Sequence, residues 1–452
     1  MKLIKTIAVV GGGTSGWLSA AYLSRQFPDM KIILIDKQKG TPVGVGEGTL
    51  LNFQKFMESC GLARYEWFNE IQSVNKAGIL FPKFKSDNHE IWHPFDFKGS
   101  FDDWSRRQSA SFKHEVLSLY ETSVREKQVV ESKINSYALH VDCTLLALYI
   151  KLKLKNKILF IDSEVKNIER DENNYITQLN LLDGTKVNAD LYLDCTGFKA
   201  LLNNNKKRES LKKRLICDTA IACHVQYQDI AREQNPYVNS EAVSCGWVWN
   251  IPTQSRIGTG LVFNRSITRP EDALDKFREY WSNRVDPAKC RMIDWTPYYD
   301  KNFWHQNVVQ IGLSAGFVEP LESTGVALIM EGIYHFASRI EKLYYTERDP
   351  QMYNHVMNMF FGESVDFINM HYVKNEKDTP FWNNANELEM SDRQKLMIEV
   401  LKDPNISLDI IGSSNTFQKY NFFSTFNWLV WMIQMGYDVA PRNFRLKEKQ
   451  WL

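Results

Sequence analysis

The sequence predicts an α/β protein with a Rossmann-type sheet, an interleaved β-rich layer and a helical C-terminal region. Three observations near the N-terminus indicate the sheet. Residues 7–10 form a β-branched run that ends in the glycine turn GGGTSG, and residues 17–27 then have the apolar spacing of a helix. Residues 31–36 form a second apolar strand. A strand, glycine turn, helix and strand in this order are how a doubly wound sheet begins.

The glycine turn fits the dinucleotide-binding pattern GxGxxG. Gly11 permits a tight turn, Gly13 lets a pyrophosphate approach the backbone, and Gly16 permits close packing of the helix. The helix begins near Thr14 and Ser15, and its N-terminus favours the charge of a phosphate. The turn therefore predicts a phosphate-binding site, and a purely structural glycine turn is the alternative.

Asp36 ends the second strand, about 20 residues after Gly16. A carboxylate at this place accepts the ribose hydroxyls of a dinucleotide, so the spacing favours dinucleotide binding over the structural alternative. Only one such fingerprint is present. A flavoprotein that takes hydride from its own NADPH often has a second nucleotide-binding fold, so the sequence favours a flavin that is reduced elsewhere.

The later elements follow from apolar spacing and turn signals. Asp183 and Gly184 form a strong hairpin turn between two strands. Residues 73–98 have an extended, aromatic pattern, and the last hundred or so residues are mainly helical. Helices are expected at residues 51–72, 107–131, 140–155, 271–285 and 325–345. Strands are expected at residues 158–165 and 190–197, with several more within 216–265.

The composition is typical of a globular protein, with 452 residues, 44% hydrophobic and 24% charged. A net charge of +1 implies no bulk attraction to nucleic acid or to an anionic membrane. The N-terminus lacks the features of a signal peptide, and no apolar stretch is long enough to span a membrane. No nucleic-acid or membrane partner is therefore expected.

The 7 cysteines are dispersed and form no CxxC pair. This predicts reduced thiols in a cytoplasmic setting, and it argues against a disulfide framework or a zinc site. His89, Glu90 and His93 lie near one another but lack the spacing of HxH or HExxH. We therefore expect no metal.

Three further motifs carry more specific information. The segment VNKAGILF places Lys76 on an extended apolar face, shared with Val74, Gly78 and Leu80. The segment GWVWNIP contains the pattern WxWxIP, and EPLESTG at residues 319–325 separates two apolar runs. Together with GGGTSGW, GVGEGT, DLYLDCTGF and PFW, these segments resemble the flavin-dependent halogenases typified by the tryptophan halogenases. The resemblance covers residues 1 to about 345 and is looser beyond.

The resemblance implies a reaction. Reduced FAD reacts with O2 to give a hydroperoxide, a halide ion attacks its outer oxygen, and hypohalous acid passes through a tunnel to a lysine. The lysine, matched by Lys76, holds the acid by a hydrogen bond or becomes a haloamine, and an electron-rich aromatic is halogenated. Glu322 is the matched carboxylate, which can stabilise and deprotonate the cationic ring intermediate. Thr324 and Gly325 match the halide site, where backbone amides at a helix start suit an anion.

The resemblance also assigns the cofactor and the two domains. Gly46 and Glu47 match a strap beside the flavin ring. Val165, Leu313 and Gly325 are also expected to contact the flavin. We expect an FAD-binding domain over residues 1–345, with interleaved substrate-layer segments at about 73–135 and 205–300, and a mainly helical capping region over 346–452.

The motif residues also have simpler interpretations. Lys76 alone would be a solvated lysine, and Glu322 alone a helix-start acid favoured by the helix dipole. Trp247 and Trp249 stand two apart and should point the same way on a strand, either as a core pair or as a wall between flavin and substrate. Glu319 is expected to be structural.

The substrate pocket is expected to hold His93, Pro94, Phe95 and Trp428. Relatives that take free tryptophan clamp its polar groups with a tyrosine pair and a glutamate, and no such pair is found here. An indole or phenol held by stacking is therefore favoured over free tryptophan. The comparable region offers an aromatic set: Tyr420, Phe422, Phe423, Phe426, Trp428 and Trp431.

The expected partners follow from the reaction. FADH2 must come from a separate NAD(P)H-dependent flavin reductase, and chloride, bromide or iodide could each be used. By analogy with dimeric relatives, a homodimer is compatible with the sequence. The alternative function is a flavin-dependent monooxygenase that hydroxylates an aromatic substrate, and Lys76 and WxWxIP argue against it.

Overall fold

The computed structural model describes residues 2–37, 46–94, 137–403, 422–423 and 425–439. Phe95, Tyr420, residues 44–45 of GVGEGT and the helix expected at 107–131 lie outside the described residues. The chain divides into two compact units, each built from three segments. Unit 1 comprises residues 1–73, 141–211 and 296–361, and unit 2 comprises residues 74–140, 212–295 and 362–452.

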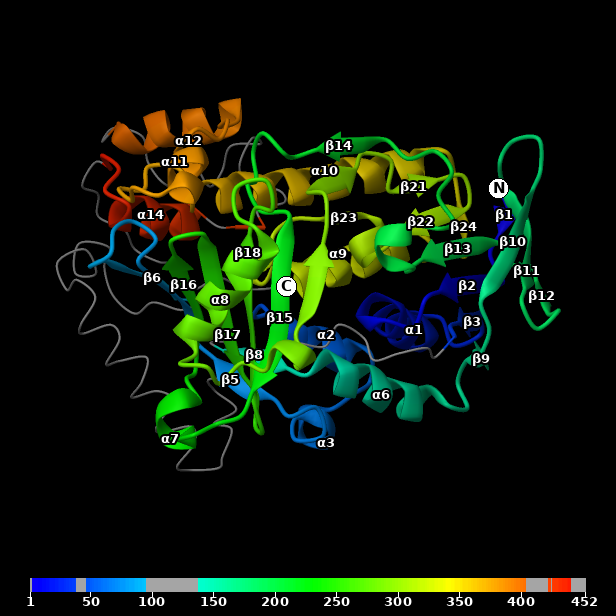
Figure 1. The fold of residues 1–452 in the computed structure, drawn as a ribbon. Helices are drawn as coiled ribbons and strands as arrows, with labels where there is room; N and C mark the ends of the chain where they lie inside the picture. The colour runs from blue at the N-terminus through cyan, green and yellow to red at the C-terminus, as the bar shows by residue number, and fades with distance from the viewer. Residues whose placement is uncertain (1, 38–45, 95–136, 404–421, 424, 440–452) are drawn as a thin grey trace. The chain divides into compact units, whose positions relative to one another are not determined.

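Unit 1 is built on a six-stranded sheet of the predicted Rossmann type (Figure 1). Five of its strands are parallel, and only the edge strand β21 runs antiparallel to its neighbour. The three central strands, Leu191–Asp194, Thr6–Val10 and Lys31–Ile35, are almost wholly buried, as a parallel sheet requires. In spatial order they are β21 (Trp304–His305), β22 (Val308–Gln310), β13 (Leu191–Asp194), β2 (Thr6–Val10), β3 (Lys31–Ile35) and β9 (Leu159–Ile161).

The helices and strands of unit 1 follow the predicted pattern with two differences. The helix expected at 51–72 is two short helices, and the strand expected at 158–165 is divided between β9 and β10. The hairpin at Asp183 and Gly184 is confirmed, because it joins β11 to β12. The helices are α1 (Thr14–Gln26), α2 (Phe53–Ser59), α3 (Arg64–Trp67), α6 (Cys143–Leu154) and α9 (Thr324–Arg339).

Small antiparallel sheets complete the strands of unit 1. The sheet β10–β11–β12 comprises Val165–Arg170, Ile176–Leu181 and Lys186–Val187. A second small sheet consists of β14 (Arg208–Ser210), β20 (Tyr298–Asp300) and β23 (Gly316–Phe317). A third consists of β1 (Lys2–Leu3) and β24 (Tyr344–Tyr345). The short strand β4 is Glu47–Gly48.

Unit 2 is built on a seven-stranded, mostly antiparallel sheet. In spatial order its strands are β19 (Arg291–Asp294), β15 (Thr219–Val225), β18 (Ile257–Phe263), β17 (Gly246–Pro252), β16 (Val238–Val243), β6 (Gly78–Pro82) and β7 (Glu90–Pro94). Outside this sheet, β5 (Val74–Lys76) pairs antiparallel with β8 (Ala138–Val141). The helices are α7 (Ile230–Glu233), α8 (Pro270–Tyr280), α11 (Pro380–Asn386), α12 (Asp392–Lys402) and α14 (Thr425–Gln434). Helix α10 (Arg348–Asn369) contains the boundary between the units.

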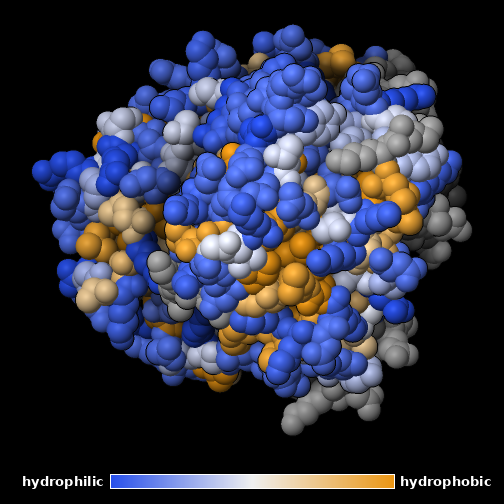
Figure 2. All heavy atoms as spheres, turned by 90° about the vertical axis from the view of Figure 1, so that its right-hand side faces the viewer, coloured by the Kyte–Doolittle hydropathy of each residue, from blue (hydrophilic) through white to orange (hydrophobic). Residues whose placement is uncertain are grey.

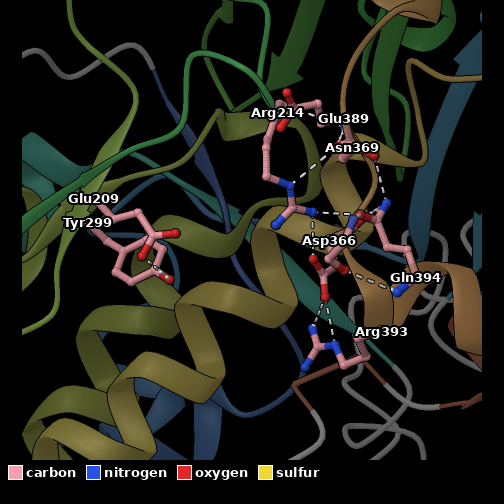
Figure 3. A network of polar contacts seen from close by, with 9 residues as sticks. Glu209, Arg214, Tyr299, Asp366, Asn369, Glu389, Arg393 and Gln394 are labelled. Carbon is pink, nitrogen blue, oxygen red and sulfur yellow. Dashed lines mark hydrogen bonds and ion pairs between the residues drawn. The ribbon is translucent and has the colours of Figure 1, made fainter.

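A buried carboxylate joins two helices, α10 and α12 (Figure 3). Asp366 of α10 is 3% exposed and accepts from two guanidinium groups. Arg214 donates to its Oδ1 at 2.6 Å, and Arg393 of α12 donates to its Oδ2 at 2.6 Å. Gln394 donates to the backbone carbonyl of Asp366 at 3.0 Å and to Asn369 at 2.6 Å. One acidic side chain therefore links α10, α12 and the segment that precedes β15.

The surface is mixed in character. Figure 2 shows one face on which hydrophobic areas lie between hydrophilic ones. The large apolar side chains that remain exposed in unit 1 include Leu3 at 54%, Leu159 at 45% and Leu182 at 57%. Among the described residues, no helix has the length and apolarity that crossing a membrane would require.

Candidate functional site

The glycine turn of unit 1 leaves space for a ligand at one glycine only. Gly11 has a φ of +107°, and a Cβ there would lie 2.2 Å from the carbonyl oxygen of Cys195. A Cβ on Gly16 would lie 1.8 Å from the carbonyl oxygen of Gly11, so both positions need glycine for packing. A Cβ on Gly13 would meet nothing within 4 Å. Gly13 thus borders open space at the start of α1, whose first turn has no acidic residue and no side-chain cap.

Asp36 lies beside the same turn. The backbone N–H of Gly12 donates to its carboxylate, and a Cβ on Gly12 would lie 2.5 Å from Oδ2. Burial raises the pKa of Asp36. The carboxylate therefore lies at the end of β3 next to the glycine turn, where the ribose of a dinucleotide would be bound.

We expect Gly13→Ala to fold normally but to bind FAD roughly 10- to 100-fold more weakly. The added methyl group has space in the protein, yet it occupies the place where the pyrophosphate must approach the backbone. Titration of the apoprotein with FAD, followed by flavin fluorescence, measures the change. Gly362→Ala is the matched control, because its Cβ also meets nothing within 4 Å and it lies in α10. Unchanged affinity in Gly13→Ala would remove the turn from the cofactor site.

A second turn of unit 1 lies against the start of α1. A Cβ on Gly312 would lie 2.9 Å from the Cβ of Ser15 and 3.4 Å from Ile329 of α9. The next residue, Leu313, is an apolar side chain that is 38% exposed. Val165 is partly buried and packs on the cluster formed by residues of β2 and β3. Leu313 thus offers apolar surface near α1, as a flat ring system requires.

The motif EPLESTG folds as a short 3-10 turn followed by a helix. Pro320–Glu322 form the turn, Ser323 adopts a left-handed conformation with φ 58°, and α9 begins at Thr324. This confirms the predicted helix start. Glu322 is 1% exposed, and Glu319 is fully buried.

The first turn of α9 has the properties of an anion site. The hydroxyl of Thr324 is buried and has no hydrogen-bond partner. A Cβ on Gly325 would meet nothing within 4 Å, and the first turn of the helix contains no acidic residue. An unpaired buried hydroxyl beside open space at a helix start is a suitable environment for an anion.

Glu47 belongs to a chain of polar contacts in unit 1. Its carboxylate pairs with the thiol of Cys143, and that thiol also contacts Thr14 at the start of α1. Desolvation raises the pKa of Glu47 to about 7. The structure thus brings Glu47 close to the glycine turn, and Cys143 is a contact that the sequence did not reveal. Gly46, directly before it, is buried with a φ of +81°.

Lys76 is fully buried at the end of β5 in unit 2. Its Cα partner on β8 is Ala138. The extended segment predicted around Lys76 is divided into two strands, β5 and β6, at Ala77, whose N–H donates to the carbonyl of Pro236. Burial of the lysine itself agrees with the apolar surroundings expected for it. A buried ammonium group is costly unless it has a partner or a function.

His140 is a neighbour of Lys76 that the sequence did not reveal. It lies on β8 two residues from Ala138, so it is the diagonal neighbour of Lys76 on one face. Its Nδ1 donates to the carbonyl of Pro252, the proline of WxWxIP, at 3.0 Å. Its Nε2 is buried without a partner. Desolvation, and next the charge of Lys76, lower the pKa of His140 to about 3.

We expect His140 to make unit 2 sensitive to acid. The pKa of His140 falls from 6.5 to about 3 on folding, so the folded protein accommodates only the neutral imidazole. Below pH 6.5 the unfolded chain binds a proton that the folded chain does not, and the folded state therefore loses stability as pH falls toward 3. His140→Gln keeps a donor for Pro252 but cannot be protonated. Between pH 6.5 and 4, wild type should lose about 1.4 kcal/mol per pH unit more than the variant in unfolding free energy. Denaturant titrations at four pH values test this, and parallel curves would contradict it.

The tryptophans of WxWxIP point to the same face of β17, as predicted. Their ring centroids lie 6.2 Å apart, and both side chains are buried. The indole of Trp249 lies over Gly260 on the adjacent strand, where a Cβ would be 2.2 Å from the ring. Trp247 donates from its indole to the hydroxyl of Tyr372 at 2.9 Å.

Two of the predicted pocket residues meet at one aromatic side chain. The ring of Phe367 in α10 stacks on that of Phe423, with the ring centroids 4.2 Å apart. Its centroid also lies 5.2 Å from that of Trp428 and 5.4 Å from that of His93. Asn427 contacts Nε2 of His93 at 2.7 Å. Phe367 was not predicted, because nothing in its helical pattern separates it from core positions. Pro94 ends β7 beside His93.

Glu363, one turn before Phe367, holds the segment that precedes α14. Its carboxylate accepts from the backbone N–H groups of Phe422 at 2.9 Å and Phe423 at 3.0 Å. Burial raises the pKa of Glu363 to about 7. This carboxylate therefore positions the two phenylalanines of the expected substrate region.

A cavity of about 690 Å³ lies in unit 2 but contains none of the predicted site residues. It is lined from β17 by Asn250 and Pro252, which point to the opposite side of the strand from Trp247 and Trp249. Four of its charged side chains pair with one another, Lys83 with Glu241 and Arg284 with Glu233. Within the described residues, no group of histidine, cysteine, aspartate and glutamate is arranged to hold a metal ion.

Known proteins are similar to this chain in sequence and fold over most of its length. The model of the family described as tryptophan halogenase matches residues 6–448. A tryptophan 7-halogenase of Lentzea aerocolonigenes is 28% identical over 438 residues, which cover 88% of this chain and 82% of that protein. A tryptophan 6-halogenase of Streptomyces albogriseolus is 26% identical over 484 residues, covering 97% and 90%.

Solved structures agree with the sequence comparisons. A flavin-dependent halogenase from Xanthomonas campestris superposes with a TM-score of 0.86 at 25% identity, covering 98% of this chain and 90% of that one. A flavin-dependent halogenase from Brevundimonas sp. BAL3 superposes with a TM-score of 0.83 at 27% identity, covering 96% and 90%. The mixed α/β fold predicted from the glycine turn is thus confirmed.

Proposed function

Since the chain belongs to the tryptophan halogenase family and is a flavin-dependent halogenase, we propose that it halogenates an electron-rich aromatic by way of Lys76. The observation that carries the proposal is a lysine with no exposed surface on β5, which pairs with β8, where His140 contacts Pro252 of the WxWxIP strand. A solvated lysine, the simpler interpretation, would be exposed. The net reaction replaces an aromatic hydrogen with halogen: ArH + HOX gives ArX + H2O.

Unit 1 supplies the groups that would hold the flavin. Gly13, Thr14 and Ser15 would bind the pyrophosphate, and Asp36 the ribose. The open space beside Gly13 supports this assignment. Val165, Leu313, Gly46 and Glu47 are proposed as further contacts. When bound and reduced, FAD supplies the activation of O2 that oxidises a halide ion.

Thr324 and Gly325 would hold the halide. The unpaired hydroxyl of Thr324 and the free N–H groups of the first turn of α9 favour an anion. Chloride, bromide and iodide all satisfy these donors. The residue before Ser323, Glu322, is proposed to accept the aromatic proton, and its burial on the 3-10 turn supports a defined position.

Lys76 would hold hypohalous acid by donating a hydrogen bond, or would form a haloamine. In the second case R–NH2 + HOX gives R–NHX + H2O, and transfer of X to the ring restores the amine. The buried, uncharged imidazole of His140 beside Lys76 supports a pocket of low polarity. Hypohalous acid would persist longer in such a pocket than in water.

The substrate is proposed to be an indole or phenol held by stacking. Phe422 and Phe423 lie in the region where a tyrosine pair would clamp free tryptophan, and a phenylalanine offers no hydroxyl for that role. Phe423, Trp428 and His93 all contact Phe367, which supports an aromatic environment. Trp247 and Trp249 are proposed as the wall that keeps the flavin chemistry away from the organic substrate.

A separate NAD(P)H-dependent reductase is proposed to supply FADH2. The single glycine fingerprint supports this, because the sequence contains no second pattern of that type for a nicotinamide donor. The dispersed, unpaired cysteines support a reducing, cytoplasmic setting.

A substrate panel tests the proposed function. The enzyme is supplied with a flavin reductase, FAD, NADH and each halide in turn, and indoles, phenols and free tryptophan are analysed by mass spectrometry. Halogenated indoles or phenols are expected, with free tryptophan a poor substrate. A dye that traps hypohalous acid is included. Absence of both halogenated product and trapped acid would overturn the proposal, and hydroxylated products would replace it with a monooxygenase.

A further inference from the structure

Two cysteines lie opposite each other at the edge of the seven-stranded sheet. Cys223 is in β15, and Cys290 directly precedes the edge strand β19. The two strands pair antiparallel, with Ala222 opposite Arg291. Advancing one residue along β15 and going back one residue on the other strand places Cys223 opposite Cys290. The backbone of Cys290 is extended, with φ −75° and ψ 144°, so the strand geometry continues to it.

Their separation suits a disulfide. Residues directly opposite on antiparallel strands have Cα atoms about 4.5–5.5 Å apart. Disulfides are formed across Cα separations of about 4.4–6.8 Å. The two thiols are close enough for each to influence the pKa of the other, and both side chains pack in one cluster with Ile221 and Phe277. The thiol of Cys290 donates to the backbone carbonyl of Asp286 at 3.4 Å. Little movement of the backbone is therefore needed to join them.

The pair has one accessible and one shielded sulfur. Cys223 is 3% exposed, whereas Cys290 is only partly buried. An oxidant from solvent therefore meets Cys290 first, with Cys223 directly behind it. The other five thiols are buried. Four of them contact hydroxyl or carboxyl groups: Cys60 contacts Ser59, Cys143 contacts Glu47 and Thr14, Cys195 contacts Ser15 and Ser19, and Cys217 contacts Tyr372.

We propose that Cys223 and Cys290 form a reversible disulfide when the protein meets a two-electron oxidant, namely hypohalous acid or hydrogen peroxide. With hypohalous acid, Cys290–SH + HOX gives Cys290–SX + H2O. The thiol of Cys223 then attacks that sulfur, which gives the disulfide and HX. With peroxide, the first step gives Cys290–SOH + H2O, and the second releases another water. Exchange with an external dithiol restores both thiols.

The surroundings of the pair favour hypohalous acid over peroxide. Burial raises the pKa of the Cys223 thiol to about 12 and also raises that of Cys290. Little thiolate is therefore present at neutral pH, and a weak electrophile such as peroxide reacts slowly. A halogenase releases the stronger electrophile whenever hypohalous acid leaves before it meets a substrate. The pair would then consume stray oxidant and fasten the edge strand β19 to β15.

The test treats the full-length, FAD-loaded protein with one molar equivalent of hypochlorous acid or hydrogen peroxide. Peptide mapping under non-reducing conditions should find the peptides of Cys223 and Cys290 joined, and titration in denaturant should show the loss of two thiols per chain. Dithiothreitol should restore both. Hypochlorous acid should give at least tenfold more bridge than peroxide at equal times. Added reagents make this test independent of the role proposed for Lys76.

Two variants sharpen the result. Cys245→Ser is the matched control, because Cys245 is buried in the same cluster. In this variant the bridge between Cys223 and Cys290 should form as in wild type. Cys290→Ser should form no bridge. During turnover with bromide and no aromatic substrate, catalase removes peroxide, so a bridge that still forms identifies hypohalous acid as the source. Oxidation of Cys290 to sulfinic or sulfonic acid without a bridge, or no loss of thiols, would overturn the proposal.

Discussion

Replacing Lys76 by methionine is expected to remove nearly all halogenated product while hypohalous acid is still released. Methionine fills the apolar site but offers no ammonium or amine group. A positioned side chain that takes part in the chemical step contributes roughly 10²–10⁴-fold, so product formation should fall by that factor. The groups proposed to bind flavin are elsewhere in the sequence and are unchanged. Product is measured by mass spectrometry, and free acid by a trapping dye.

The control for Lys76→Met is Lys83→Met. Lys83 is an exposed lysine near the same segment, and its ion pair with Glu241 is on the surface. This control should keep the wild-type rate. Retention of FAD by Lys76→Met would show that the variant is folded. Product within about tenfold of wild type in Lys76→Met would remove Lys76 from the mechanism.

Replacing Asp366 by alanine is expected to cause the largest loss of stability outside the chemical site. The carboxylate has 5% side-chain exposure and pairs with both Arg214 and Arg393 (Figure 3). Its removal leaves two partly buried guanidinium groups without their shared anion, which costs roughly 3–5 kcal/mol. At roughly 2–4 °C per kcal/mol, the Tm should fall by roughly 6–20 °C. Calorimetry of both proteins at equal concentration measures the fall.

Asp392→Ala is the matched control for Asp366→Ala. Asp392 is also an aspartate with a basic partner on α12, but its side chain is fully exposed. Its loss should change stability by no more than about 0.5 kcal/mol. A double-mutant cycle of Asp366→Ala with Arg393→Ala should be strongly non-additive. Equal, small losses in Asp366→Ala and Asp392→Ala would show that the buried network contributes little.

The parts of the fold that local sequence determines were predictable. Strand β2, helix α1 and strand β3 follow from apolar spacing and three glycines, because each contact involves residues close in sequence. The start of α9 at Thr324 follows from the polar turn before an apolar helix. The shared face of Trp247 and Trp249 follows from the period of two along a strand.

The parts that depend on distant pairing were not predictable. The segment after Lys76 divides because Ala77 donates to Pro236, far along the chain, and no local pattern encodes that bond. His140 becomes a neighbour of Lys76 only through the register of β5 with β8. Cys223 and Cys290 likewise meet only through the register of β15 with β19. Dispersed cysteines in a sequence therefore do not exclude a close pair in the fold.

The mass of the product formed under ¹⁸O2 with bromide tests the central claim most directly. If oxygen is spent on oxidising halide and Lys76 delivers the halogen, the product carries bromine, seen as a pair of isotope peaks of similar height, and no ¹⁸O. Water is then the destination of the oxygen atom. A product that carries ¹⁸O and no bromine would contradict the claim, because the oxygen would have gone to the aromatic ring.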